Sequence, residues 1–164
     1  MFTSDQIGMA KVDAVKDIIC RINPTAEKTI EIRPDGYNGE RLSGYVFLAM
    51  DNIDLRKMFF EKNKTNLDIK AVFDFRTELE SAQHYAADWR NSEMKKFLWE
   101  TMDFTHEEAH ETEAVSACGI TLGVATTVRL ICGVGVNNFI NYLRKGELKK
   151  MILFNGFDFF IDVF

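Results

Sequence analysis

The sequence predicts an α/β protein in which a mixed sheet is flanked by helices and ends in a C-terminal β-hairpin. The run YVFLAM, residues 45–50, is continuously apolar and bounded by polar residues, as is typical of a parallel strand buried on both faces. The closing segment KKMILFNGFDFFIDVF places Asn155-Gly156 between two apolar runs, which predicts a tight hairpin with left-handed backbone at both turn positions. Helical periodicity between these strands completes the α/β pattern.

The other elements follow from local patterns. Apolar residues at helical spacing predict an amphipathic helix from about Lys11, which Asn23-Pro24 stops because the residue before a proline avoids helical backbone. Ile30 and Ile32 predict a short strand at 29–33. Further along we expect a helix at 54–62, strands at 69–75 and 81–88, a helix in RNSEMKKFLWETM, and a long helix from about Val115 to Arg144 that ends at Gly146.

Length and composition limit the classes of function. The 164 residues, 46% of them apolar, suit one domain with one core. A formal charge of -5 argues against nucleic-acid partners, and no apolar run is long enough to cross a membrane. We therefore expect a cytoplasmic protein that binds neither nucleic acid nor a membrane. Cys20, Cys118 and Cys132 are odd in number and far apart, so they predict neither a disulfide framework nor a CxxC zinc pair.

Two positions suggest a ligand site. Asp51-Asn52 follows the strand at 45–50, and ligands of open parallel sheets bind beyond the carboxyl ends of the strands, where a carboxylate could meet a cation or a hydroxyl. The alternative is that Asn52 or Asp54 caps the next helix. Lys11 places a positive charge in the first turn of its helix, against the helix dipole, which an anion could offset. An exposed lysine of small cost is the simpler interpretation.

Two further motifs are weaker. His106-Glu107-Glu108-Ala109-His110 matches HExxH, in which two histidines hold zinc and the glutamate is a general base, but no third ligand is evident and a charged connector is the alternative. The segment Gly133-Val134-Gly135-Val136-Asn137-Asn138 begins like a dinucleotide fingerprint, yet it lacks the third glycine and lies within a helical pattern. Close helix packing explains this segment better.

Three stretches together resemble the ThiF/MoeB/HesA family of adenylyltransferases, which includes the ubiquitin-activating enzymes. SDQIGMAKVDAVKDIICRINP is similar to the family's Ile-Gly, lysine, helix and Ile-Asn-Pro stretch. YVFLAMDNIDLRKMFFEKN is similar to its buried strand that ends in Asp-Asn, and ACGITLGVATTVRLICGVGVNNFINYLRKGELKKMILFNGF to its late helix and hairpin. The resemblance spans nearly the whole chain and implies a partial Rossmann-like fold.

The resemblance implies ATP-dependent activation of the C-terminus of a ubiquitin-like or sulfur-carrier protein through an acyl-adenylate. Lys11 would contact the ATP phosphates, Asp51, next to Asn52, would hold magnesium near the nucleotide, and Cys118 lies where several members carry a nucleophile. Positioning and charge neutralisation would supply most of the catalysis. A buried thiol in an apolar helix is the alternative for Cys118.

The chain lacks the family's first strand, its GxGGxGS phosphate loop and its zinc-binding CxxC pairs. Residues 1–164 would then be a single truncated domain, inactive alone, whose missing strands belong between those at 29–33 and 45–50. Unpaired strands favour covering by a second copy or by another chain. The alternative function is a non-catalytic oligomerisation or interaction module, and a zinc hydrolase is the third possibility.

Overall fold

The structure, a computed structural model, describes residues 3–111 and 125–164. The chain divides into two compact units, Met1–Asn38 and Gly39–Phe164. The organisation of residues 1–164 as one domain stays a prediction. In the described part of the chain, the helices are too short or too polar to cross a membrane.

The first unit is built around α1 (Lys11–Ile22), with the 3-10 helices η1 (Ser4–Gln6) and η2 (Pro24–Lys28) before and after it. Asn23 ends α1, as its place before proline predicts, and its side chain accepts a hydrogen bond from the Thr25 backbone N–H at 3.2 Å. Arg21 bonds Asp17 one turn earlier at 2.8 Å and Asp5 at 3.1 Å, which ties the helix to the segment before it.

The strand predicted at 29–33 is wrong. The backbone N–H of Ile30 donates to the carbonyl of Ala26 at 3.1 Å, so the chain continues the turn of η2 where a strand should begin. The described residues of this unit form no strand, so an extended segment here would have no neighbouring strand in the unit to pair with. Alternating isoleucines are therefore insufficient to specify a strand.

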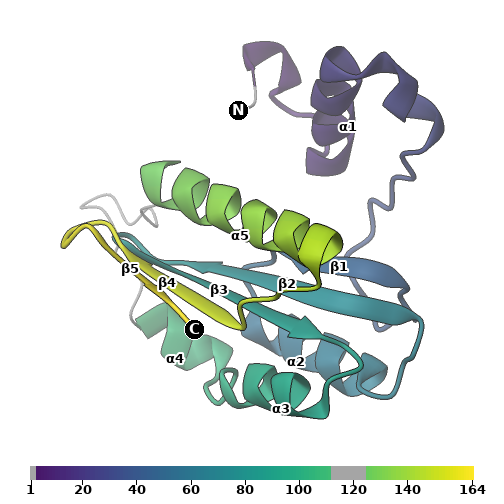
Figure 1. The fold of residues 1–164 in the computed structure, drawn as a ribbon. Coiled ribbons are helices and arrows are strands. Elements are labelled where there is room, and N and C mark those ends of the chain that lie inside the picture. The colour runs from purple at the N-terminus through teal and green to yellow at the C-terminus, as the bar shows by residue number, and fades with distance from the viewer. Residues whose placement is uncertain (1–2, 112–124) are drawn as a thin grey trace. The chain divides into compact units, whose positions relative to one another are not determined.

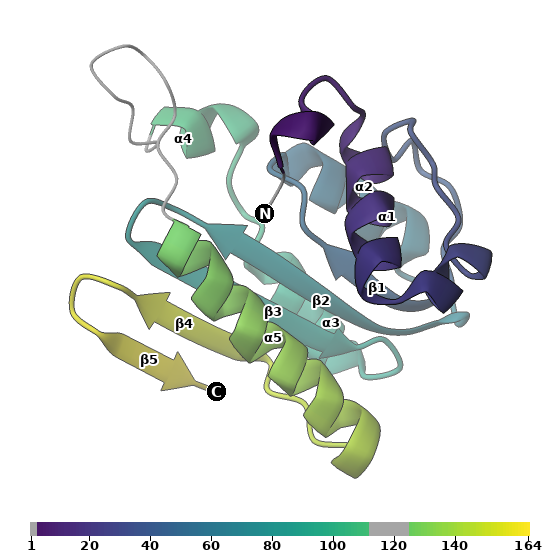
Figure 2. The same cartoon turned by 90° about the horizontal axis from the view of Figure 1, so that it is seen from above.

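The second unit contains a five-stranded sheet in the order β1-β2-β3-β4-β5 (Figure 2). β1 (Gly44–Leu48) is parallel to β2 (Ile69–Thr77), and the remaining neighbours are antiparallel: β3 (Ser81–Asp88), β4 (Met151–Asn155) and β5 (Phe160–Val163). The predicted fold class is confirmed: a mixed α/β sheet with flanking helices and a C-terminal hairpin.

Helices cover both faces of this sheet. α5 (Ala125–Lys145) lies on one face, and α2 (Ile53–Asn63) and α3 (Ser92–Glu100) lie on the other, with α4 (His106–Glu111) beyond the end of α3 (Figure 1). α2 joins β1 to β2 in the crossover that parallel strands require. Gly146 ends α5 with φ 73°, and its N–H donates to the carbonyl of Tyr142, as the expected glycine stop predicts.

Each face of the sheet has its own apolar core. Under α5, the ring of Phe73 lies 5.2 Å from that of Phe139 in an edge-to-face arrangement, and Ala71 and Ala86 pack beside it. Under α2 and α3, the fully buried Trp89 contacts Phe59 and donates from its indole nitrogen to the carbonyl of Asn63 at 2.8 Å. The sheet is thereby fixed between two helical layers.

The structure differs from the sequence-based prediction in two details of the strands. Phe47 is 43% exposed, so β1 is not buried on both faces; among the described strands β1 is at the edge of the sheet and has β2 as its single neighbour. The hairpin is present, but its loop runs over residues 156–159 and the positive φ falls on Phe159. Asn155 instead accepts backbone hydrogen bonds from Phe157 and Asp158, which builds a longer turn than the predicted two-residue one.

Candidate functional site

A pocket of about 910 Å³ opens in the second unit at the carboxyl ends of β1 and β2. Its wall includes Asp51 after β1, Arg76 at the end of β2, and Gln83 near the start of β3. Arg56 of α2 and Glu108 of α4 contribute from the helical side. This is the edge at which α/β sheets bind ligands, and the volume suits a ligand of drug or nucleotide size.

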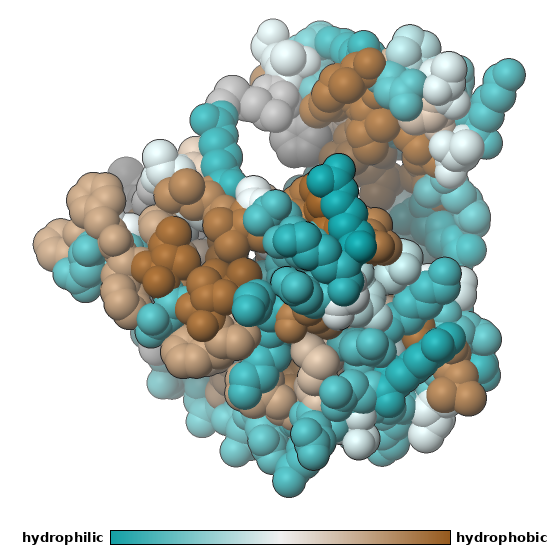
Figure 3. Space-filling view, viewed as in Figure 1, coloured by the Kyte–Doolittle hydropathy of each residue, from teal (hydrophilic) through white to brown (hydrophobic). Residues whose placement is uncertain are grey.

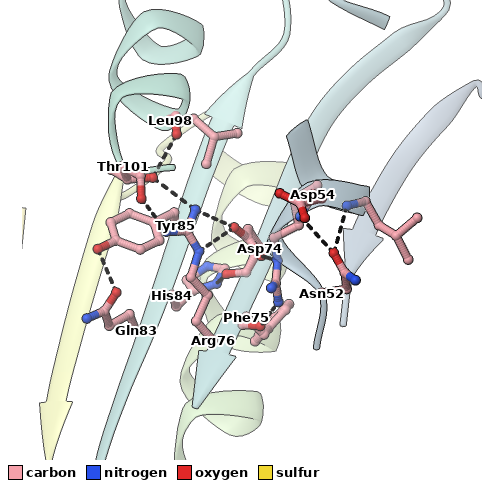
Figure 4. A network of polar contacts seen from close by, with 12 residues as sticks. Asn52, Asp54, Asp74, Phe75, Arg76, Gln83, His84, Tyr85, Leu98 and Thr101 are labelled. Atoms are coloured by element: carbon pink, nitrogen blue, oxygen red, sulfur yellow. Dashed lines mark hydrogen bonds and ion pairs between the residues drawn. The ribbon is translucent and has the colours of Figure 1, made fainter. Parts of the chain in front are cut away.

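Asp74 organises the floor of the pocket. It lies on β2 among apolar residues and its side chain is fully buried between two guanidinium groups (Figure 4). Arg56 donates from Nε to one carboxylate oxygen, and Arg76 donates from Nε to the other, each at 2.8 Å. A buried carboxylate needs such partners to remain charged. Two guanidiniums share one carboxylate, so this cluster carries a surplus positive charge.

Arg76 is occupied by structural bonds. Its Nη1 and Nη2 donate to the carbonyl and hydroxyl of Thr101 at 2.6 and 2.9 Å, which fastens β2 to the end of α3 (Figure 4). The guanidinium also stacks over the ring of Tyr85, 4.6 Å from its centroid. Arg76 therefore holds the floor in place.

Arg56 retains donors for a ligand. Its Nη2 donates to the carbonyl of Phe75 at 2.9 Å, and Asp74 takes Nε, but in the described part of the chain no acceptor engages Nη1. The side chain is 6% exposed and lines the pocket. A nearly buried guanidinium with open donors is suited to a planar anionic group such as a carboxylate or phosphate.

Acidic side chains surround this basic floor. Glu78 accepts from the hydroxyl of Ser81 at 2.8 Å, and Glu108 accepts from the backbone N–H of Thr105 at 2.6 Å. The two hydrogen bonds from Thr105, the backbone one first, hold the pKa of Glu108 below its usual value. The exposed Asp51 has no hydrogen-bond partner among the described residues, so its carboxylate is available to the pocket.

A neutral histidine supports the cluster from the α5 face. Nδ1 of the fully buried His84 donates to the backbone carbonyl of Asp74 at 3.1 Å, and because a carbonyl only accepts, the proton must sit on Nδ1. Nε2 then accepts from the amide of Asn138 at 3.1 Å. Burial lowers the pKa of His84 to about 4, despite the opposing effect of the Asp74 carbonyl and charge.

The predicted site residues are not all brought together. Asp51 lines the pocket, and Asn52 caps α2 by accepting from the N–H groups of Asp54 and Leu55 at 2.8 and 3.2 Å, so the capping alternative holds for Asn52. Lys11 is the exposed first residue of α1, in the other unit, and its pairing with Asp51 stays a prediction. Cys118 lies outside the described residues.

The two weaker motifs lie on helices. His106 begins α4 and is partly buried, and within the described ranges no three His, Cys, Asp or Glu side chains gather as metal ligands. In the glycine segment, a Cβ on Gly135 would lie 2.2 Å from the ring of Phe75, so this glycine permits close packing of α5 on the sheet. Gly133 faces open space.

Sequence reasoning assigned no role to Arg56, Asp74, Arg76 or His84. One indication was present: Asp74 interrupts the apolar strand at 69–75, and Arg76 two residues later must share its face. A buried acid on a strand predicts a cationic neighbour. That a second arginine would come from α2 depends on tertiary packing, which the local pattern does not encode.

No family model matches the chain, and no curated protein matches it. Among solved structures, it is similar to the crystal structure of selenomethionine PaaA, with a TM-score of 0.59 and 13% sequence identity. The match covers 99% of this chain and 57% of PaaA, so the chain spans just over half of that protein's length. At this identity, the likeness concerns the fold alone.

These comparisons correct the family and the function expected from the sequence. PaaA, to whose solved structure the chain is similar, is not named for the ThiF/MoeB/HesA family, and no family model supports that family. Activation of a ubiquitin-like or sulfur-carrier protein by adenylation is therefore withdrawn. The resemblance was wrong because it depended on short apolar, glycine and Asp-Asn patterns, which many α/β sheets share.

Proposed function

We propose that the second unit binds a small ligand with a phosphate or carboxylate group in the pocket at the ends of β1 and β2. The observation that carries the proposal is Arg56: its guanidinium is almost buried, it lines a pocket of about 910 Å³, and Nη1 has no acceptor among the described residues. An anionic ligand in the pocket could accept charge-assisted hydrogen bonds from the open donors of Arg56.

Magnesium is the proposed companion of this ligand, at Asp51. Mg²⁺ is commonly bound through one or two carboxylates together with phosphate oxygens of the ligand, so a protein cage of three ligands is unnecessary. The carboxylate of Asp51 faces the same pocket as Arg56 and has no hydrogen-bond partner among the described residues. ATP with magnesium is accordingly the first probe, and pyrophosphate isolates its anionic part.

The cytoplasm is the proposed location. Cys20 and Cys132 are free thiols, with Cys132 exposed, and the reducing cytoplasm keeps thiols in this state.

Calorimetric titration of the full chain with MgATP, magnesium-free ATP and pyrophosphate tests the proposal. We expect saturable binding that weakens roughly tenfold or more in Arg56→Lys, because lysine keeps the charge but lacks the guanidinium fork. Arg41→Lys is the matched control, since Arg41 is exposed and bonds Asp68 away from the pocket. Asp51→Asn should remove only the benefit of magnesium.

Two results would overturn the proposal. One is the absence of saturable binding with all three probes. The other is unchanged binding by Arg56→Lys when circular dichroism shows that the variant is folded.

A further inference from the structure

The outer edge of β5 is apolar, and no strand among the described residues pairs with it. β5 is the last strand of the sheet, and its residues Phe160, Ile161 and Val163 are 49–50% exposed. In the loop before it, Phe157 and Phe159 are 75% and 91% exposed. Figure 3 shows apolar side chains gathered over the β4–β5 hairpin. An apolar edge strand of this kind is a template for pairing with another strand.

The hydrogen bonds to β4 show which backbone groups are free. Met151 and Phe164 exchange backbone hydrogen bonds at 3.4 and 2.9 Å, so Phe164 directs its backbone polar groups toward β4. Because this direction alternates along an antiparallel strand, Asp162 and Phe160 do the same. The N–H and C=O groups of Ile161 and Val163 therefore point away from the sheet, available to a further strand.

We infer that this edge pairs with β5 of a second copy of the chain, antiparallel, about a two-fold axis at Ile161. Only residues whose backbone groups both point outward can exchange hydrogen bonds across the interface. The axis must therefore pass through a residue of β5 and cannot lie between two residues. An axis at Asp162 would place two carboxylates opposite each other, which is destabilising. An axis at Ile161 places Asp162 opposite Phe160 of the partner subunit and avoids that repulsion.

The exposed apolar area of this edge reaches the lower limit for a stable dimer when it is fully covered. An aromatic side chain can bury about 150–250 Å², and four phenylalanines of this edge, including Phe164, are 49–91% exposed. Roughly 500 Å² of aromatic surface per copy, with half of Ile161 and Val163 in addition, gives on the order of 1,200 Å² for two copies, the lower limit of stable interfaces. The interface is isologous, so it closes at two copies and forms no fibre.

Sedimentation velocity of the full chain, with two edge variants, tests the pairing. The wild type should be a dimer. Ile161→Pro should give a folded monomer, because the lost N–H points outward and no bond to β4 is removed. Leu67→Lys, at a leucine that is 76% exposed elsewhere, should remain dimeric. A monomeric wild type, or a dimer unaffected by Ile161→Pro, would overturn the inference.

Cross-linking tests the register. In Ile161→Cys the two introduced thiols face each other across the axis, at the Cα separation of about 5.5 Å of a hydrogen-bonded pair, which a disulfide spans. Oxidation should link these chains covalently, whereas Val163→Cys, opposite Phe159 of the partner subunit, should not link above the wild-type level. Linking of Val163→Cys but not of Ile161→Cys would contradict the axis at Ile161.

Discussion

Lowering the pH from 7 to 4 should destabilise the second unit through His84. The folded-state pKa is about 4, against 6.5 for an ordinary histidine, because the ring is fully buried, and the hydrogen bond to the Asp74 carbonyl only partly offsets this effect. Between these values the unfolded chain takes up the proton first. The contribution of His84 to stability is therefore complete above pH 6.5, is lost progressively as the pH falls toward 4, and changes no further below that.

The size of the effect follows from the shift. Each pKa unit corresponds to about 1.4 kcal/mol, so the difference between 6.5 and about 4 gives roughly 3 kcal/mol. A domain of this size has about 5–15 kcal/mol of total stability, so the loss should be large enough to measure by urea unfolding. At pH 5, about 2 kcal/mol of the contribution should already be gone.

The assay compares the wild type with His84→Gln in urea titrations at pH 7, 6, 5 and 4.5. The glutamine cannot titrate, so the free energy of unfolding of the wild type should fall more steeply with acid than that of the variant. An NMR titration of the His84 ring in the folded wild type gives the pKa directly. A pKa near 6.5, or parallel pH profiles of the two proteins, would refute the reasoning.

Three further predictions concern packing, charge and capping. Gly135→Ala should lower the free energy of unfolding by about 1–3 kcal/mol, because the added methyl would overlap Phe75, whereas Gly133→Ala should raise it by up to about 1 kcal/mol; equal effects in thermal unfolding would contradict this. Asp74→Asn should cost about 3–5 kcal/mol, since two guanidiniums lose their shared carboxylate; a change under 1 kcal/mol in urea would count against the cluster. Asn52→Ala should cost about 1 kcal/mol through the lost cap of α2, measured in the same way, and no loss would show that the cap is dispensable.

Most elements of the second unit could be predicted from local sequence. The strands at 69–75 and 81–88 and the stop at Gly146 are confirmed because hydrophobic periodicity and glycine chemistry act locally. The strand at 29–33 failed because a strand requires a neighbour, which its own residues cannot specify.

The candidate site was only half predictable. Asp51 could be placed at the pocket because ligands of α/β sheets bind beyond the carboxyl ends of parallel strands. Arg56 and His84 could not, since their roles depend on Asp74 and Asn138, which approach them only through packing of α2 and α5. The family resemblance failed for a related reason: short motifs specify local structure and leave chemistry undetermined.

The most direct test of the account is an NMR titration of the arginine side chains with pyrophosphate. If Arg56 meets the anion, its guanidinium N–H resonances should shift saturably, those of the occupied Arg76 should respond less, and those of the exposed Arg41 should not move. Saturable binding that leaves the Arg56 resonances unchanged, or no binding at all, would contradict the assignment of this pocket as an anion site.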